Sequence, residues 1–259
     1  MRRTIPGTPS GCPATEAGVI MLKSIIVSAF GAGLLAGALL TAVQFVTTEP
    51  LILAGEVYEK AAEAAPAPAA AHEHTDASAP AEAEHHHEEG AWEPADGFER
   101  SAYTLIANLL MGVAVSAVLL GAMTLRGGRI DAKTGLLWGV AGFFAASLLP
   151  SLGLSPELPG TAAAEIGSRQ MWWLGTVGAS AAGLALVLLA KPWWSKALGL
   201  VIAIVPHVIG APEPPTLEAA YPAVLGAEFV VASLVVSALL WSVSGLSAGW
   251  LFNRLSGRA

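Results

Sequence analysis

Cysteine and charge are the scarcest features of this chain. Its 259 residues include one cysteine, Cys12. A single cysteine excludes an internal disulfide and any CxxC metal or redox motif. Charged residues make up 13% of the chain, about half the share usual in a soluble domain. The sequence has no GxxxxGK[ST] loop, no protein-kinase motif set and no basic aromatic patch. These absences argue against an ATPase and against a nucleic-acid-binding protein.

Hydrophobic residues are what the chain has instead. They make up 54% of it, and the mean hydropathy is +0.60. Several apolar runs in the chain are long enough to cross a membrane as helices. Abundant glycine and alanine would allow such helices to approach closely in lipid. The sequence therefore predicts an all-α integral membrane protein, a bundle of about six transmembrane helices. The six segments are roughly Ser24–Val46, Ala102–Leu125, Thr134–Leu152, Trp172–Ala190, Ala197–Ala211 and Ala223–Gly245.

The distribution of lysine and arginine predicts the orientation. If both termini are cytoplasmic, ten of the thirteen basic residues but only two of the twenty carboxylates fall on the cytoplasmic side. We therefore expect a multi-pass protein of the cytoplasmic (inner) membrane of a bacterium. The fifth segment is short and is interrupted by Pro206, so a re-entrant hairpin is the alternative. That alternative would place Arg254 and Arg258 outside, against the charge bias.

The domain organisation follows from these segments. We expect residues 1–20 to form an irregular tail, with Met21 as an alternative start of the protein. Residues 21–46 form the first helix, 47–101 an extracytoplasmic flexible loop rich in histidine and acid, and 102–259 the other five helices. Within the loop, residues 61–90 are rich in Ala, Pro and Glu without apolar periodicity, which predicts disorder.

Five of the six histidines lie within residues 72–90, the histidine-rich segment: His72, His74, His85, His86 and His87. The same segment holds six carboxylates and no lysine or arginine. Imidazole and carboxylate together suit Co²⁺, Ni²⁺, Zn²⁺ and Cu²⁺, and a flexible segment imposes little geometric selectivity. We interpret the segment as an external metal-capture device. A low-complexity spacer is the main alternative, and an internal run this short does not resemble an engineered tag.

Polar residues near the outer helix ends form a second candidate site, because such residues are costly in lipid. His207, after Pro206, is either a metal ligand or a histidine bonded to a carbonyl that the proline leaves free. Glu228 is either its metal-binding partner or an ion-pair partner of Arg169. Asn108 and Gln44 are expected to join helices by hydrogen bonds. Gln170 lies beside Arg169 at the same depth.

Two stretches of the sequence resemble each other, and both lie at the same end of the predicted bundle. We call this similarity the echo. "LLPSLGLSPELPG" (148–160) and "IVPHVIGAPEPP" (204–215) share the order Pro, Gly, Pro-Glu, Pro. The echo suggests that helix hairpins 2–3 and 4–5 are parallel repeats, with Glu157 and Glu213 as equivalent carboxylates at a mouth. Convergent helix-stop chemistry is the alternative.

Several blocks together resemble the CbtA family: "EVYE" (56–59), "DGFERSAYTLIANLLMGVAVSAVLL" (96–120), "GLLWGVAGFFAASLLPSLGLSPELPG" (135–160), "RQMWWLGT" (169–176) and "PHVIGAP" (206–212). The resemblance covers about residues 21–254. It implies a cobalt transporter subunit associated with cobalamin biosynthesis, working with a small single-helix membrane partner of the CbtB type. It also implies Co²⁺ as the transported ion, with no organic cofactor. The loop histidines, Glu157, Arg169, Gln170 and His207 are the positions of interest that it adds.

The combined prediction is a permease subunit for divalent cobalt, which captures the metal outside and passes it through the bundle. One alternative is an accessory metal-delivery subunit that does not itself conduct. Another is a transporter of nickel or a different divalent metal. No nucleophile–base pair supports an enzyme.

Overall fold

The fold is all-helical in the residues that the computed structural model describes, which are 14–64, 92 and 94–257. The sole β feature among them is an isolated bridge between Thr161 and Ala219. The helices are α1 (Ala14–Gln44), α2 (Thr48–Glu63), α3 (Phe98–Arg126), α4 (Ala132–Phe143), the π-helix η1 (Phe144–Leu148), α5 (Leu149–Ser151), α6 (Ile166–Leu189), α7 (Trp193–Ile209) and α8 (Ala223–Ser256).

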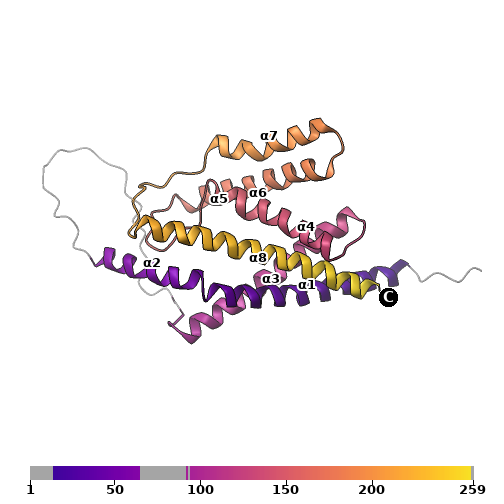
Figure 1. Cartoon of the computed structure of the whole chain (residues 1–259), viewed down its shortest axis with the longest axis horizontal. Helices are drawn as coiled ribbons and strands as arrows, with labels where there is room; N and C mark the ends of the chain where they lie inside the picture. Colours follow the sequence, from indigo (N-terminus) through magenta and orange to yellow (C-terminus); the bar gives the residue numbers. More distant parts are fainter. Residues whose placement is uncertain (1–13, 65–91, 93, 258–259) are drawn as a thin grey trace, which may run out of the picture.

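The predicted helical bundle is confirmed. Five helical stretches are long and apolar enough to cross a membrane, and α7 is a shorter apolar helix. In Figure 1 the start of α1, the end of α8 and the α3–α4 and α6–α7 connections lie at the right-hand end. The six segments thus alternate in direction along one axis. We call the opposite end, where α5 and α7 finish and α8 begins, the far end.

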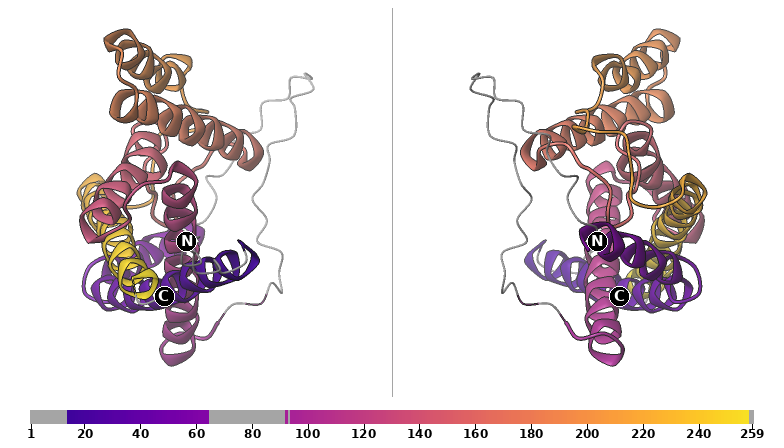
Figure 2. Two further views of the ribbon diagram at one scale, coloured as in Figure 1. Left: turned by 90° about the vertical axis from the view of Figure 1, so that its right-hand side faces the viewer. Right: turned by 90° about the vertical axis from the view of Figure 1, so that its left-hand side faces the viewer.

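The helices are stacked as an open series of layers. Helix α1 packs against α3 and α8, α4 packs against α8, and α6 packs against α7. The α6–α7 pair meets the rest of the protein chiefly at η1 and α5. Figure 2 shows this pair set apart from the group formed by α1, α3 and α8, with α4 between them. Helix α7 is therefore an edge of the stack.

Small residues fill the helix interfaces, and large apolar residues face outward. Ala32, Ser28, Ser116 and Ala248 are fully buried. Leucine, valine, isoleucine and phenylalanine side chains on the same helices are exposed, as are Trp193 and Trp194 at the α6–α7 turn. In lipid, close backbone packing rather than burial of apolar surface drives helix association. The distribution is that of a membrane protein.

Glycine sets the spacing at the tightest contacts. A Cβ at Gly135 of α4 would lie 2.0 Å from the carbonyl oxygen of Gly245 in α8. A Cβ at Gly112 of α3 would lie 2.2 Å from the carbonyl oxygen of Gly33 in α1. Only a residue without a side chain fits at these positions, so the backbones approach as in small-residue membrane dimers.

Two helical stretches lie where the sequence predicted irregular chain. Helix α2 occupies residues 48–63, within the range expected to be a flexible loop, and α1 begins at Ala14, within the expected irregular tail. Gly55 of α2 is buried against Leu158 and Pro159, so tertiary packing stabilises this helix. Residues 1–13 and the histidine-rich segment lie outside the described residues.

The third membrane segment changes geometry just before Pro150. Here α4 gives way to the π-helix η1, and α5 follows. Proline has no N–H to donate, and its ring clashes with a carbonyl of the preceding turn. A wider π turn relieves that clash, so Pro150 accounts for η1. In α7, by contrast, the α-helix continues past Pro206 to Ile209.

The two predicted hairpin repeats pack differently. Helices α6 and α7 form a close pair, in which Gly183 and Gly199 face each other. Helices α3 and α4 touch little, because α3 packs on α1 and α4 packs on α8. The structure therefore does not show hairpins 2–3 and 4–5 as one repeated packing unit.

Candidate functional site

The polar residues singled out in the sequence are divided between two parts of the far end. One part surrounds the first turns of α6 and includes Glu157, Arg169, Gln170 and His207. The other lies between α1 and α3 and includes Gln44 and Asn108. The five histidines of the histidine-rich segment, His72, His74, His85, His86 and His87, lie outside the described residues.

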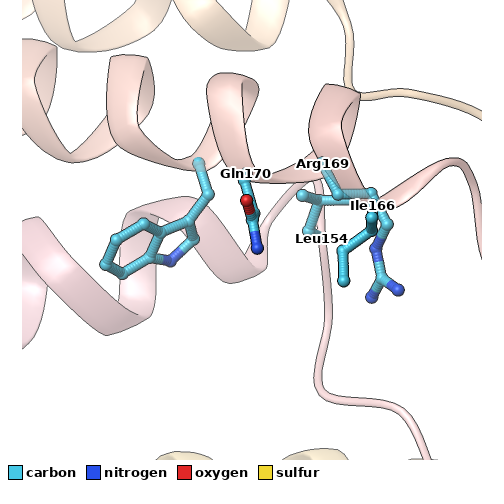
Figure 3. Close-up of a pocket in the computed structure, with 5 residues that line it drawn as sticks. Leu154, Ile166, Arg169 and Gln170 are labelled. Carbon is cyan, nitrogen blue, oxygen red and sulfur yellow. The ribbon is translucent and has the colours of Figure 1, made fainter.

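Arg169 and Glu157 form an ion pair at the mouth of a surface hollow. Arg169 Nη2 lies 2.7 Å from Glu157 Oε2, and each side chain is about 30% exposed. The hollow has a volume of about 280 Å³ and is lined by Leu154, Ile166, Arg169, Gln170 and Trp173. Figure 3 shows Arg169 and Gln170 extending from the first turn of α6 toward the side on which Leu154 lies. We call this hollow, with Glu157, the outer mouth, after the orientation that the lysine and arginine distribution predicts.

The start of α6 is fixed by its N-cap, which positions Arg169. The Glu165 carboxylate accepts hydrogen bonds from the N–H groups of Gly167 and Ser168, each at 2.7 Å. These bonds satisfy donors that the first helical turn leaves free. They also lower the pKa of Glu165 below its ordinary value. The capped turn then presents Arg169 and Gln170 from a defined helix start.

Trp172 joins the two outer helix ends of the sequence echo. Its Nε1 donates to the carbonyl oxygen of Pro206 at 3.3 Å, and its ring meets the His207 ring edge-on at 5.8 Å between centroids. A Cβ at Gly153 would lie 2.4 Å from the Trp172 ring and 3.1 Å from Ala211 Cβ. The segments after Pro150 and after Pro206 therefore come together on this indole.

The Nε2 atom of His207 is buried and has no hydrogen-bond partner among the described residues. An unpaired buried nitrogen of this kind calls for a physical explanation. The carbonyl of Pro206 accepts hydrogen bonds from Trp172 Nε1 and from the N–H of Gly210, the latter at 3.1 Å. No protein group among the described residues is bonded to Nε2, which makes this nitrogen a candidate ligand atom.

Asn108 and Gln44 are hydrogen-bonded between helices, as the sequence predicted. Asn108 Nδ2 of α3 donates to Gln44 Oε1 at 2.5 Å and to Thr41 Oγ1 at 3.0 Å, both on α1. Thr41 Oγ1 in turn donates to the carbonyl of Gly37. This network joins α1 to α3 near the far end, so its role is structural.

A second set of contacts, which sequence reasoning missed, holds α2 to the bundle. Arg100 forms an ion pair with Glu56, and this bond lowers the pKa of Glu56 below 4.5. Glu59 Oε1 accepts from the N–H of Gly160 at 3.1 Å. The charged stretch "EVYEKAAE" at residues 56–63 was the available signal, because Glu56 and Glu59 lie on one helical face.

Two predicted carboxylates stand apart from these contacts. Glu228 and Glu213 are exposed, and Arg169 pairs with Glu157 rather than with Glu228. No ion pair joins His207 to Glu228 in the part of the chain that the structure describes. Within the same residues, no group of three or more His, Cys, Asp or Glu side chains could hold a metal ion. A closed metal site is therefore not preformed there.

Comparison with protein families gives one match over nearly the whole chain. The family model described as "Probable cobalt transporter subunit (CbtA)" matches residues 22–253. Searches of curated proteins and of solved structures return no significant match. Among the described residues, the family match covers all but a few end residues of the helices that could cross a membrane. This chain is thus a multi-pass membrane protein that belongs to the CbtA family of cobalt transporter subunits.

Proposed function

We propose that this chain is the Co²⁺ permease subunit of an uptake system. The histidine-rich segment captures the ion outside the cytoplasmic membrane, and the outer mouth receives it. The family match supports cobalt as the cargo. The grouping of Glu157, Arg169, Gln170 and His207 at one end of the bundle supports the entry point. That end also carries the flanks of the histidine-rich segment, because α2 ends there (Figure 1).

The Glu157–Arg169 ion pair at the outer mouth is the basis of the proposed entry step. Glu157 is occupied by Arg169, so an entering ion must take the place of the guanidinium on the carboxylate. A divalent ion attracts a carboxylate more strongly than a monovalent group at the same distance. The half-exposed pair is worth at most about 1 kcal/mol, so the exchange costs little. The membrane potential then favours inward movement by about 2.3 kcal/mol per charge per 100 mV.

The unpaired Nε2 of His207 is the proposed inner ligand after this exchange. Neutral imidazole is a common ligand of divalent transition metals. The imidazole ring packs edge-on against Trp172. Glu228 is a further candidate ligand, from the first turns of α8. Nickel shares the same ligand preferences, so it is the expected competitor.

Uptake of radiolabelled Co²⁺ into proteoliposomes under an inside-negative potential tests this function. Saturable uptake that Ni²⁺ inhibits would support the permease role. If the chain alone shows no uptake but a small single-helix CbtB-type subunit restores it, the permease requires its partner. Binding without uptake, even with the partner present, would leave only an accessory delivery role.

Paired substitutions at the outer mouth test the exchange step. Arg169→Gln frees Glu157 and should lower the Co²⁺ concentration at half-maximal uptake. Glu157→Gln should raise it. Glu213→Gln is the matched control, because Glu213 is exposed at the corresponding place in the echo. Shifts of the same sign for Arg169→Gln and Glu157→Gln would contradict the exchange.

Two further variants separate capture from passage. Replacing the five histidines of the histidine-rich segment with alanine should slow uptake at low Co²⁺ and leave the maximal rate unchanged. His207→Phe keeps an aromatic ring against Trp172 but removes Nε2, so it should lower the maximal rate. Undiminished transport by His207→Phe would remove His207 from the pathway.

A further inference from the structure

A second hollow lies deeper than the outer mouth and is lined by hydroxyl groups. It has a volume of about 250 Å³ and lies between the η1–α5 segment, Trp173 of α6 and the middle of α8. Five serines line it: Ser147 of η1, Ser151 of α5, Ser155 just after α5, and Ser233 and Ser237 of α8. We call it the serine hollow. No prediction from the sequence involved these serines.

The serines form two facing rows rather than a scatter. Ser147 and Ser151 are four residues apart near the end of the third membrane segment, as are Ser233 and Ser237 on α8, so each pair lies on one helical face. The rows meet where Ser237 Oγ donates to Ser147 Oγ at 2.7 Å. Ser151 Oγ donates to the carbonyl of Leu148 at 2.7 Å. The hydroxyl oxygens keep acceptor capacity for water or a cation.

The backbone beside the hollow is irregular at Pro150. The hollow is lined by Ala146 and Ser147 of η1 and by Pro150 of α5. Because Pro150 has no N–H, one carbonyl of the π turn lacks its usual helical donor. Single π turns occur frequently at functional positions in helices. Hydroxyl and carbonyl oxygens at one level are hard ligands that can replace part of the water shell of a divalent cation.

The serine hollow adjoins the outer mouth. Leu154 and Trp173 line both, so these two side chains form their shared wall. Polar groups within a membrane segment face the bundle interior or a water-filled cavity, because exposure to lipid is costly. A row of hydroxyls leading inward from a charged mouth fits this rule.

We propose that the serine hollow is the membrane-embedded binding site through which a partly hydrated divalent cation leaves the outer mouth. This inference rests on the proposed permease function. The Glu157 carboxylate of the outer mouth and the His207 imidazole select the ion, and the neutral oxygens of the hollow hold it weakly enough to let it move on. Trp173 separates the two volumes.

The first test measures hydration of the hollow. Ser237→Cys, in a Cys12→Ser background, is treated in proteoliposomes with a small cationic methanethiosulfonate. Ser180→Cys is the matched control, because Ser180 is fully buried on α6 and lies outside the hollow. We expect Ser237→Cys to react much faster than Ser180→Cys. Equal, slow labelling of the two would overturn the proposal whatever the protein transports.

The second test measures Co²⁺ uptake by variants of the hollow. Ser147→Ala/Ser237→Ala removes the paired hydroxyls and should lower uptake about tenfold, whereas Ser180→Ala should not change it. Ser233→Leu fills the hollow while leaving the Ser147–Ser237 bond in place, and should block uptake in a protein that still folds. Normal uptake by both hollow variants would overturn the proposal. Absence of uptake by the unsubstituted chain together with its partner would instead overturn the permease function, and with it the pathway.

Discussion

Replacing Gly112 with alanine tests whether glycine sets the distance between α1 and α3. The added Cβ would lie 2.2 Å from the carbonyl oxygen of Gly33 and 3.0 Å from the nitrogen of Gly37. Both neighbours are helix backbone, which cannot rotate out of the way. The two helices must therefore separate by about 1 Å to reach ordinary contact distance.

The expected cost follows from that displacement. Forcing a methyl group into a close-packed contact typically costs about 1–3 kcal/mol. For a protein of this size, each kcal/mol lowers the unfolding midpoint by about 2–4 °C. Gly112→Ala should therefore unfold several degrees below the natural protein. The eight tryptophans allow the midpoint to be followed by fluorescence in detergent.

Gly121 supplies the control within the same helix. Its Cβ would have no heavy atom within 4 Å. Alanine also favours a helix interior over glycine by about 0.5–1 kcal/mol, so Gly121→Ala should leave the midpoint unchanged or raise it. If Gly112→Ala and Gly121→Ala unfold at the same temperature, the close α1–α3 contact does not exist in the protein.

Three further predictions concern other contacts. Arg100 lowers the pKa of Glu56, so their bond stabilises the fold above pH 4.5 and is lost as the pH falls through that lowered pKa. On acidification, the unfolding midpoint of the natural protein should therefore fall more steeply than that of Glu56→Gln. In a double-mutant cycle, Asn108→Ala and Gln44→Ala should show a coupling of about 1 kcal/mol, and strict additivity would contradict the bond. Gly210 has φ +91°, so Gly210→Ala should cost about 1–3 kcal/mol in chemical unfolding, with an unchanged midpoint as the contrary result.

The membrane segments could be predicted from the sequence because hydropathy is a local property. Length, charge bias and the interrupting Pro206 together indicated five long apolar helices and one short one. The bonding of Asn108 to Gln44 was also predictable, because polar residues at matching depths of adjacent helices find each other.

Features that depend on tertiary contacts could not be predicted in the same way. The residues of α2 are mostly helix formers such as Ala, Leu and Glu, but the packing of Gly55 on Leu158 and the Arg100–Glu56 pair are tertiary contacts. Its local signals were Glu49 followed by Pro50, residues favoured in a first helical turn, and the charged stretch at residues 56–63. The presence of a proline did not by itself predict the π turn before Pro150, because α7 stays α-helical around Pro206.

In the candidate site, too, the sequence pointed to individual residues but did not predict the contacts between them. The internal echo singled out Glu157, and polarity near the helix ends singled out Arg169 and His207, but neither predicted their partners. Glu157 was expected to bind metal, and Arg169 was one of two alternative partners for Glu228, whereas the structure pairs Arg169 with Glu157. Serine passes unnoticed in a membrane helix because it is common there as a small residue. The four-residue spacing of Ser147, Ser151 and Ser155 was the available signal.

Because the helices are stacked openly, the contacts that would break when α6 and α7 move differ from the contacts that stabilise the fold. The α6–α7 pair touches the rest of the described protein chiefly at η1 and α5, whereas the α1–α3, α1–α8 and α4–α8 interfaces are extensive. A rocking motion of α6–α7 about that joint would therefore break few contacts and leave the glycine-spaced interfaces intact. The outer mouth and the serine hollow both lie at the joint, so their width can change without loss of the core.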